Sequence, residues 1–168
     1  KKSNITGRTT DPTKLGANPK VLLRKTGDRL IATLDASGIF PEQSLYFLYN
    51  FKPNIEPRYI LGLVNSNLLT MYFRDRLATN IESIAQIKKF HLDILPIRTI
   101  NFADAPDKAR RDRVVALVEQ MLDLHKRLHA AKTETDRELY QRQIDATDQQ
   151  IDALVYELYG LTEEEIAV

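Results

Sequence analysis

Two histidines four residues apart, His125 and His129, are the first candidates for chemistry in this sequence. Residues at this spacing share one face of a helix, as in a two-histidine metal pair. A zinc site, however, needs three or four ligands. No glutamate stands between these two in the metalloprotease arrangement, and the third histidine, His91, belongs to another segment. We therefore interpret the pair as seam or surface histidines and predict no metal site.

Motifs for nuclease and methyl-transfer chemistry are missing as well. A magnesium-dependent nuclease of the common restriction type needs Asp/Glu-x-Lys, and no such triplet occurs. Asp107, which stands beside Lys108, is better explained as a favourable charge in the first turn of a helix. The Gly-rich loop and the Asn/Asp-Pro-Pro-Tyr/Phe turn of adenine methyltransferases are also absent. We predict no catalytic and no cofactor-binding residue in this chain.

The best candidates for binding are four basic residues in a short stretch: Lys20, Arg24, Lys25 and Arg29. Lysine and arginine attract phosphates, and a guanidinium fork can read the edge of a guanine. Strand alternation places Lys20 and Arg24 on one face and Lys25 on the other, so all four reach one duplex only if the strand twists or ends at a loop. For any one of them, a solvated strand edge protected by charge is the alternative.

An aromatic run at residues 46–51 offers a second possibility, a platform on which bases stack. Apolar residues 45, 47, 49 and 51 fall on one face of a strand, which favours core packing for them. Tyr46 falls on the opposite face. It is the one aromatic residue of this run that we predict to contact DNA.

Charge is distributed unevenly along the chain. Residues 1–58 hold ten Lys/Arg against five acids, a net +5, whereas residues 106–168 hold nine against fourteen, a net −5. A polyanionic partner is therefore expected on the front half, with the tail facing protein or solvent.

Composition excludes several classes of protein. The chain has 43% hydrophobic and 28% charged residues, the balance of a globular protein. It has no cysteine, which excludes disulfides and thiolate sites and fits a cytoplasmic location. The longest apolar run, residues 59–64, is far shorter than the roughly 20 residues that span a bilayer. Because the chain opens Lys1-Lys2-Ser3-Asn4, we expect it to be a piece of a longer protein.

The front half must position the candidate residues, and its pattern predicts a small mixed unit of strands and helix. The expected elements are an irregular arm at 1–19, strands at 20–26 and 29–34 joined by a tight turn at Gly27-Asp28, strands at 44–51 and 92–97, and a helix from 57 to about 76. Asn65-Ser66-Asn67 falls inside that buried helix, where polar side chains need partners. We interpret it as a structural tie to a loop or strand.

The tail predicts a long antiparallel helical hairpin. Apolar stripes cover about 25 residues on either side of a joint at 130–133, with Asp104 and Thr135 as N-caps and Gly160 as the stop. The fold class is therefore α+β, with a small mixed unit at 1–105 and a long antiparallel helical hairpin at 106–168.

Four stretches together resemble the TaqI-like C-terminal specificity region of Type IIG restriction-modification enzymes and related adenine methyltransferases. They are Lys20-Val-Leu-Leu-Arg-Lys-Thr-Gly-Asp-Arg-Leu-Ile-Ala-Thr33, Tyr59-Ile-Leu-Gly-Leu-Val-Asn-Ser-Asn-Leu-Leu69, Ala85-Gln-Ile-Lys88 with Leu95-Pro96-Ile97, and Ile151-Asp-Ala-Leu-Val-Tyr-Glu-Leu-Tyr-Gly-Leu-Thr-Glu-Glu-Glu165. The resemblance covers residues 20–168 in the family's order. Small departures are Val64, where leucine is usual, and Asn67, where a basic residue is common.

The resemblance implies a parent protein that methylates adenine with S-adenosylmethionine and, where it also cleaves, uses Mg²⁺. The implied partners of this chain are double-stranded DNA and the methyltransferase domain of the same parent. Residues 20–105 would read DNA, and the hairpin would brace that reader. The residues alone leave one alternative open, a helical interaction module in which the acidic hairpin binds a protein and the basic half is incidental.

Overall fold

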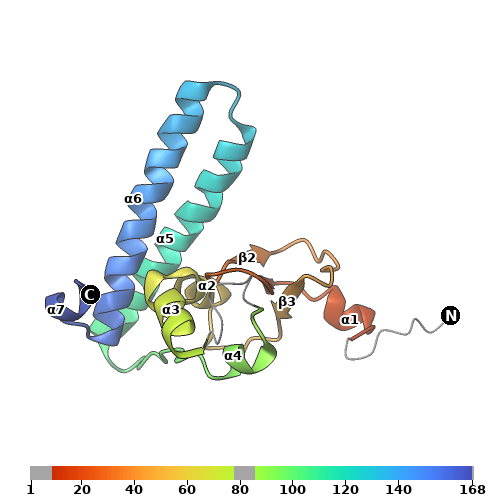
Figure 1. The fold of residues 1–168 in the computed structure, drawn as a ribbon, viewed down its shortest axis with the longest axis horizontal. Coiled ribbons are helices and arrows are strands. Elements are labelled where there is room, and N and C mark those ends of the chain that lie inside the picture. The colour runs from red at the N-terminus through yellow and green to blue at the C-terminus, as the bar shows by residue number, and fades with distance from the viewer. Residues whose placement is uncertain (1–8, 78–85, 168) are drawn as a thin grey trace.

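The computed structural model describes residues 9–77 and 86–167, and its sheet lies at the centre of the front half (Figure 1). Three antiparallel strands stand in the order β2-β1-β3. Their bounds are β1 Lys20–Arg24, β2 Ala32–Asp35 and β3 Leu45–Leu48. The predicted tight turn is wrong: residues 25–31 form a longer loop between β1 and β2. Of the irregular segment predicted at 1–19, residues 1–8 lie outside the described residues, and Pro12–Leu15 form the short helix α1.

β1 is the central strand and is buried on both faces. Val21, Leu22 and Leu23 are each at most 5% exposed. A strand that pairs on both edges and is covered on both faces needs a continuous apolar run rather than alternation. Residues 21–23, Val-Leu-Leu, form such a run.

Two short helices and a π-helical turn replace the single predicted helix. α2 spans Pro57–Asn65, α3 spans Asn67–Tyr72, and η1 spans Phe73–Leu77. Pro57 occupies the first turn of α2, where its missing N–H costs nothing. The helix stops at Ser66, whose hydroxyl accepts the Leu69 N–H at 3.3 Å and so caps α3.

The two asparagines on either side of Ser66 tie distant elements together. The Asn65 side chain accepts the Ala32 N–H at 2.8 Å and donates to the Ala32 carbonyl at 3.0 Å, which closes the outer edge of β2. The N–H and side-chain amide of Asn67 both donate to Asp152, at 2.8 and 2.6 Å. The predicted structural role of this tripeptide is confirmed.

The strand predicted at 92–97 is wrong. A five-residue helix, α4, spans Lys89–Asp93, and an irregular segment follows. His91 is buried in this helix, and its Nδ1 accepts the Lys88 N–H at 3.1 Å, which satisfies a donor at the start of α4. Burial lowers the pKa of His91.

Two long antiparallel helices project from the front half as an arm, which confirms the predicted hairpin and the α+β class (Figure 1). α5 spans Ala105–Ala130 and α6 spans Glu134–Tyr159. Gly160 ends α6 in the left-handed conformation, with φ of 69°. A capping box at Thr162 opens the last helix, α7 Glu163–Ile166. The N-cap of α6 is Thr133 rather than the predicted Thr135.

The base of the arm packs into the same core as the sheet. One cluster of buried side chains includes Leu23 of β1, Leu63 of α2, Val114 of α5 and Val155 of α6. α2 approaches α5 closely at Gly62, where an added Cβ would lie 2.8 Å from Val114 Cγ1. The division between residues 105 and 106 stays a prediction.

A polar clasp fixes the segment that leads into the arm. Asp107 Oδ2 accepts from Arg98 Nη1 at 3.0 Å and from the Asn101 N–H at 2.8 Å, and the Arg98 hydrogen bond holds the pKa of Asp107 below the ordinary value. The Tyr59 hydroxyl donates to the Arg98 carbonyl at 3.0 Å, and the Tyr159 hydroxyl accepts the Arg98 N–H at 3.2 Å. The segment before α5 is thus held by α2 and α6 together.

Candidate nucleic-acid interface

Lys20 lies inside the protein. Its ammonium is fully buried, 2.7 Å from Asp35 Oδ2, and donates to the Ala17 carbonyl at 3.0 Å. The register places Lys20 opposite Asp35, so the two charges meet across β1 and β2. The Lys20 hydrogen bond, followed by those from Ser37, holds the pKa of Asp35 well below its ordinary value. The Lys20 ammonium therefore does not reach the surface.

Arg24, at the other end of β1, is half-buried on the sheet face opposite the core cluster. A strand of this length places it about 13 Å from Lys20. Its guanidinium lies against Gly27, where a built Cβ would stand 2.3 Å from Nη2. The loop after β1 therefore folds back onto the arginine.

Lys25 and Tyr46 are neighbours in the structure. The Lys25 ammonium lies 4.6 Å from the centroid of the Tyr46 ring and donates to the Gln43 carbonyl at 2.8 Å. Tyr46 packs against the core together with Leu48, whereas Phe47 lies on the other face. The predicted assignment of faces in this strand is thus reversed. The Tyr46 ring lies against the Lys25 ammonium. The DNA contact predicted for Tyr46 stays a prediction.

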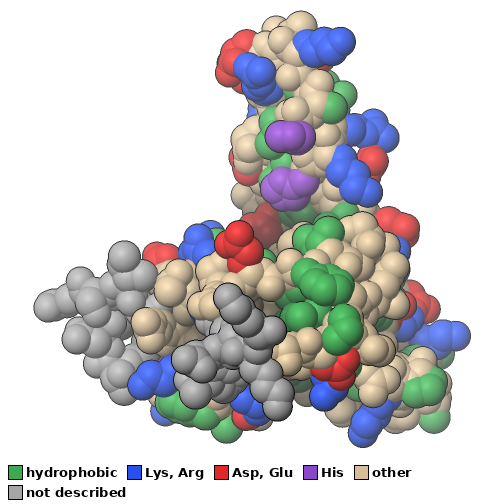
Figure 2. Space-filling view, turned by 90° about the vertical axis from the view of Figure 1, so that its right-hand side faces the viewer, with side chains coloured by type: hydrophobic (Ala, Val, Ile, Leu, Met, Phe, Trp, Pro, Cys, Tyr) green, Lys and Arg blue, Asp and Glu red, His purple; other side chains and the backbone are tan. Residues whose placement is uncertain are grey.

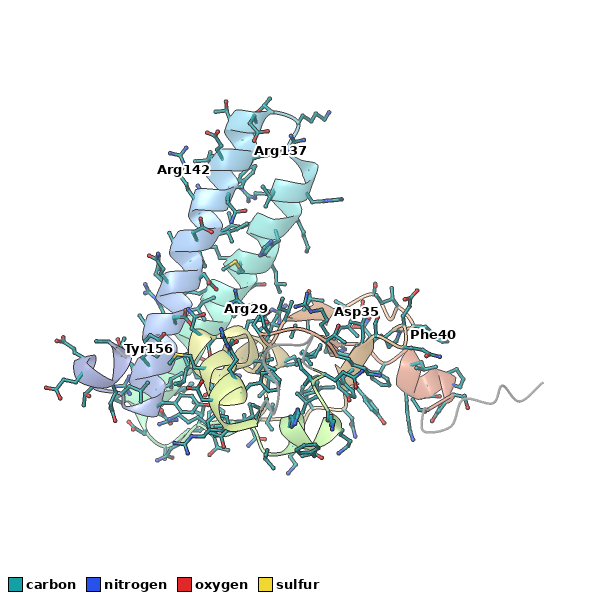
Figure 3. The ribbon with its side chains drawn as sticks, in the orientation of Figure 1. Arg29, Asp35, Phe40, Arg137, Arg142 and Tyr156 are labelled. Atoms are coloured by element: carbon teal, nitrogen blue, oxygen red, sulfur yellow. The ribbon has the colours of Figure 1, made fainter. Side chains whose placement is uncertain are left out.

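Arg29 is exposed and lies at the base of the arm, whereas Asp35 lies toward the far end of the sheet (Figure 3). It lines a hollow of about 490 Å³ between β2, α2 and the two long helices. Asp148 lines the same hollow, and the charge of Arg29 also acts on Asp152, whose pKa is raised chiefly by burial. Arg29 therefore stands among carboxylates.

A third basic residue joins Arg24 and Lys25 from far along the chain. The Ile87 N–H donates to the Lys25 carbonyl at 2.7 Å, and Thr26 forms an isolated antiparallel bridge with Gln86. This pairing brings the exposed Lys88 beside the end of β1. We name Arg24, Lys25 and Lys88 the loop-end cluster. Sequence reasoning missed Lys88, because no local pattern relates residues 25 and 88.

The histidine pair carries no metal-binding geometry. His125 and His129 are exposed on α5, and Figure 2 shows the two histidines of the arm one above the other. Within residues 9–77 and 86–167, no group of three His, Asp or Glu side chains is arranged to hold a metal ion. No described helix is long and apolar enough to cross a bilayer.

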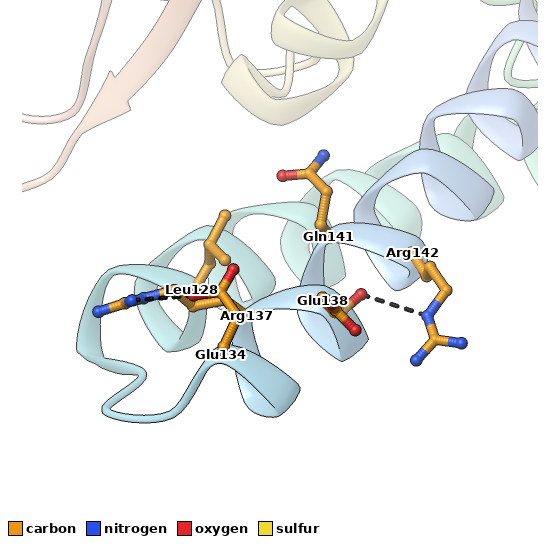
Figure 4. Close-up of a pocket in the computed structure, with 6 residues that line it drawn as sticks. All are labelled: Leu128, Glu134, Arg137, Glu138, Gln141 and Arg142. Atoms are coloured by element: carbon orange, nitrogen blue, oxygen red, sulfur yellow. Dashed lines mark hydrogen bonds and ion pairs between the residues drawn. The ribbon is translucent and has the colours of Figure 1, made fainter.

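The hollow near the tip of the arm, of about 530 Å³, holds surface side chains that are already partnered (Figure 4). Arg137 donates to Glu134 at 3.3 Å, and Arg142 Nε donates to the Glu138 carbonyl at 3.3 Å. Arg137 also donates to the Ala131 carbonyl at the end of α5, at 3.4 Å, so both arginines are engaged by neighbouring groups of the arm.

The sequence also matches a known family of domains. No curated protein sequence matches the chain. The sequence model of the TaqI-like C-terminal specificity domain matches residues 1–97, more than half of the chain. That range includes the whole sheet, α2, α3 and the loop-end cluster. The chain therefore belongs to the TaqI-like C-terminal specificity domain family.

Proposed function

We propose that this chain reads the sequence of double-stranded DNA as the target-recognition module of a restriction-modification enzyme. The observation that carries the proposal is the match of the specificity-domain family to residues 1–97. A specificity domain selects a target and leaves the reaction to other parts of the enzyme. The parent activity that we propose is adenine methylation from S-adenosylmethionine, with Mg²⁺-dependent cleavage where the parent is also a nuclease.

The loop-end cluster is the part of the front half best placed to meet DNA. Its three cations gather at one end of the sheet, and no carboxylate within the described residues lies within ion-pair distance of Arg24. Elsewhere in the front half, buried or half-buried cations are neutralised, as in Lys20 with Asp35 and Arg98 with Asp107. A cation without a carboxylate partner keeps its full attraction for phosphate.

The arm is proposed to set the reader in place rather than to bind DNA. Its residues 106–168 carry the net charge of −5, which repels a polyanion. Its base is held by Asp152 and Arg98, which fixes the base of the arm to the reader. The methyltransferase domain of the parent is the partner that we propose for the arm.

Salt-dependent binding to duplex DNA tests the proposal, with two triple charge reversals of equal size. The first changes the loop-end cluster, R24E/K25E/K88E, and the second changes the tip of the arm, K126E/R127E/K132E. Removing one phosphate contact should reduce the slope of log K against log salt by about 0.9. We expect the first variant to lose binding and the second to bind like the wild type, with circular dichroism confirming that both are folded. The opposite pattern would move the DNA surface to the arm.

A further inference from the structure

We propose that Arg24 is a specificity-determining residue that reads a guanine through the O6 and N7 edge, and that Gly27 holds its guanidinium in place for this contact. The inference rests on the function proposed above. It goes further in choosing one of the two arginines near the β1–β2 loop and in naming the base that it recognises.

The first observation is the close contact between Gly27 and the Arg24 guanidinium. Gly27 has φ of 140°, a conformation that side chains rarely adopt. A Cβ at this position would stand 2.3 Å from Arg24 Nη2, 3.1 Å from Cζ and 3.2 Å from Nε. The guanidinium therefore occupies the space that any other residue would fill. Glycine at 27 both permits the loop and makes room for the arginine.

The second observation is that the guanidinium has no partner in the protein. Arg24 Nε is buried, and no hydrogen bond or ion pair of the Arg24 side chain occurs within the described part of the chain. Buried donors are almost always satisfied, so an orphan at a surface loop points to a ligand. The guanidinium is held at the end of a central strand, and its contact with Gly27 limits its orientation. Such a group suits a pair of acceptors of fixed geometry. Guanine offers such a pair in the major groove.

Arg29 has neither the close contact with Gly27 nor a buried Nε without a hydrogen bond. It lines the hollow at the base of the arm together with Asp148, and Asp152 lies within reach of its charge. Nearby carboxylates weaken the attraction of a cation for DNA. Arg29 is therefore the weaker of the two candidates for a base contact.

Selection of binding sites from a random duplex library tests the inference, because the library contains every short target sequence. The full 168-residue chain and three variants, R24K, R24A and G27A, are each used to select DNA, with R142A as a control that removes an arginine from the arm. R24K keeps the charge and removes the fork. The added methyl of G27A displaces the guanidinium. Circular dichroism reports whether each variant folds, and if G27A does not, R24K decides.

We expect the wild type and R142A to select one motif, and R24K and R24A to lose the preference for a single guanine while keeping the rest. Their affinity for the selected site should fall roughly 5- to 150-fold, with R24K unchanged on unrelated duplexes. An unchanged motif in R24K and R24A would overturn the assignment of Arg24 and leave the proposed function standing. Equal weakening on every sequence would make Arg24 a phosphate contact and also overturn it. A wild-type chain that selects no motif would refute both proposals.

Discussion

Gly62 lets α2 lie directly against α5, and replacing it should weaken the joint between the reader and the arm. Alanine at a helix interior is favoured over glycine by about 0.5–1 kcal/mol. Here, however, the new Cβ would stand 2.8 Å from Val114 Cγ1 and 3.0 Å from Val118 Cγ2, closer than carbon atoms approach. Val114 is fully buried and stiff at χ1, so it cannot turn aside. Overpacking of this kind costs about 1–3 kcal/mol, and we expect G62A to be net destabilising.

A double-mutant cycle with V114A isolates this contact. V114A alone should cost on the order of 2 kcal/mol, because it removes two buried methyl groups. It also removes the closer of the two atoms that the new Cβ would strike and leaves Val118 Cγ2 at 3.0 Å, so in that background G62A should cost much less. The coupling energy is then roughly 1–3 kcal/mol, measured by urea unfolding followed through circular dichroism. If G62A costs the same in both backgrounds, the close approach of α2 and α5 does not limit the packing, and the reasoning fails.

Three further predictions concern single side chains. N65A should lose about 1–3 kcal/mol, because two backbone groups at the start of β2 lose their partners, and an unchanged urea midpoint would contradict this. Lys20 lowers the pKa of Asp35, so D35N should be less stable than the wild type above the ordinary carboxyl pKa of 3.8, and this difference should shrink as the pH falls below 3.8. A difference between the melting temperatures of D35N and the wild type that does not change with pH would argue against the ion pair. L117D buries a carboxylate and should cost several kcal/mol, whereas A116D on the exposed face should melt like the wild type.

The arm is the most predictable part of the fold. Its helices depend on local signals, namely apolar stripes, a glycine stop and caps, and these fix most of each helix. The two-residue error at the start of α6 has a local origin too. Thr133 with Asp136 and Thr135 with Glu138 both fit the capping pattern, and the structure uses the first, in which Thr133 accepts the Asp136 N–H at 3.1 Å.

Errors in the front half follow from contacts that no local pattern carries. The helix breaks at Ser66, and the two asparagines beside it bind distant residues. Asn65 binds Ala32, 33 residues away, and Asn67 binds Asp152, 85 residues away. Residues 92–97 suggest a strand because a short apolar run has no distinctive period. A hydrogen bond to His91 favours a helical start in the same region.

The candidate site is predictable in composition but not in arrangement. Alternation along β1 correctly separates Arg24 from Lys25, yet it cannot show that Lys20 meets Asp35 inside the protein. That outcome depends on strand register, which is set by the loop between β1 and β2. Lys88 joins the cluster through a backbone contact across 62 residues of sequence, from Lys25 to Ile87.

Among the described residues, the buried contacts of the arm lie toward its base, and its stiffness must therefore vary along its length. α5 and α6 each have 26 residues, which corresponds to about 39 Å. Between Leu124 on α5 and Ile144 on α6, no residue around the tip is buried, so the outer turns rest on half-exposed contacts alone. Buried contacts are what resist local opening. A partner held at the base would be positioned rigidly with respect to the reader, whereas one held at the tip would be attached through an elastic element.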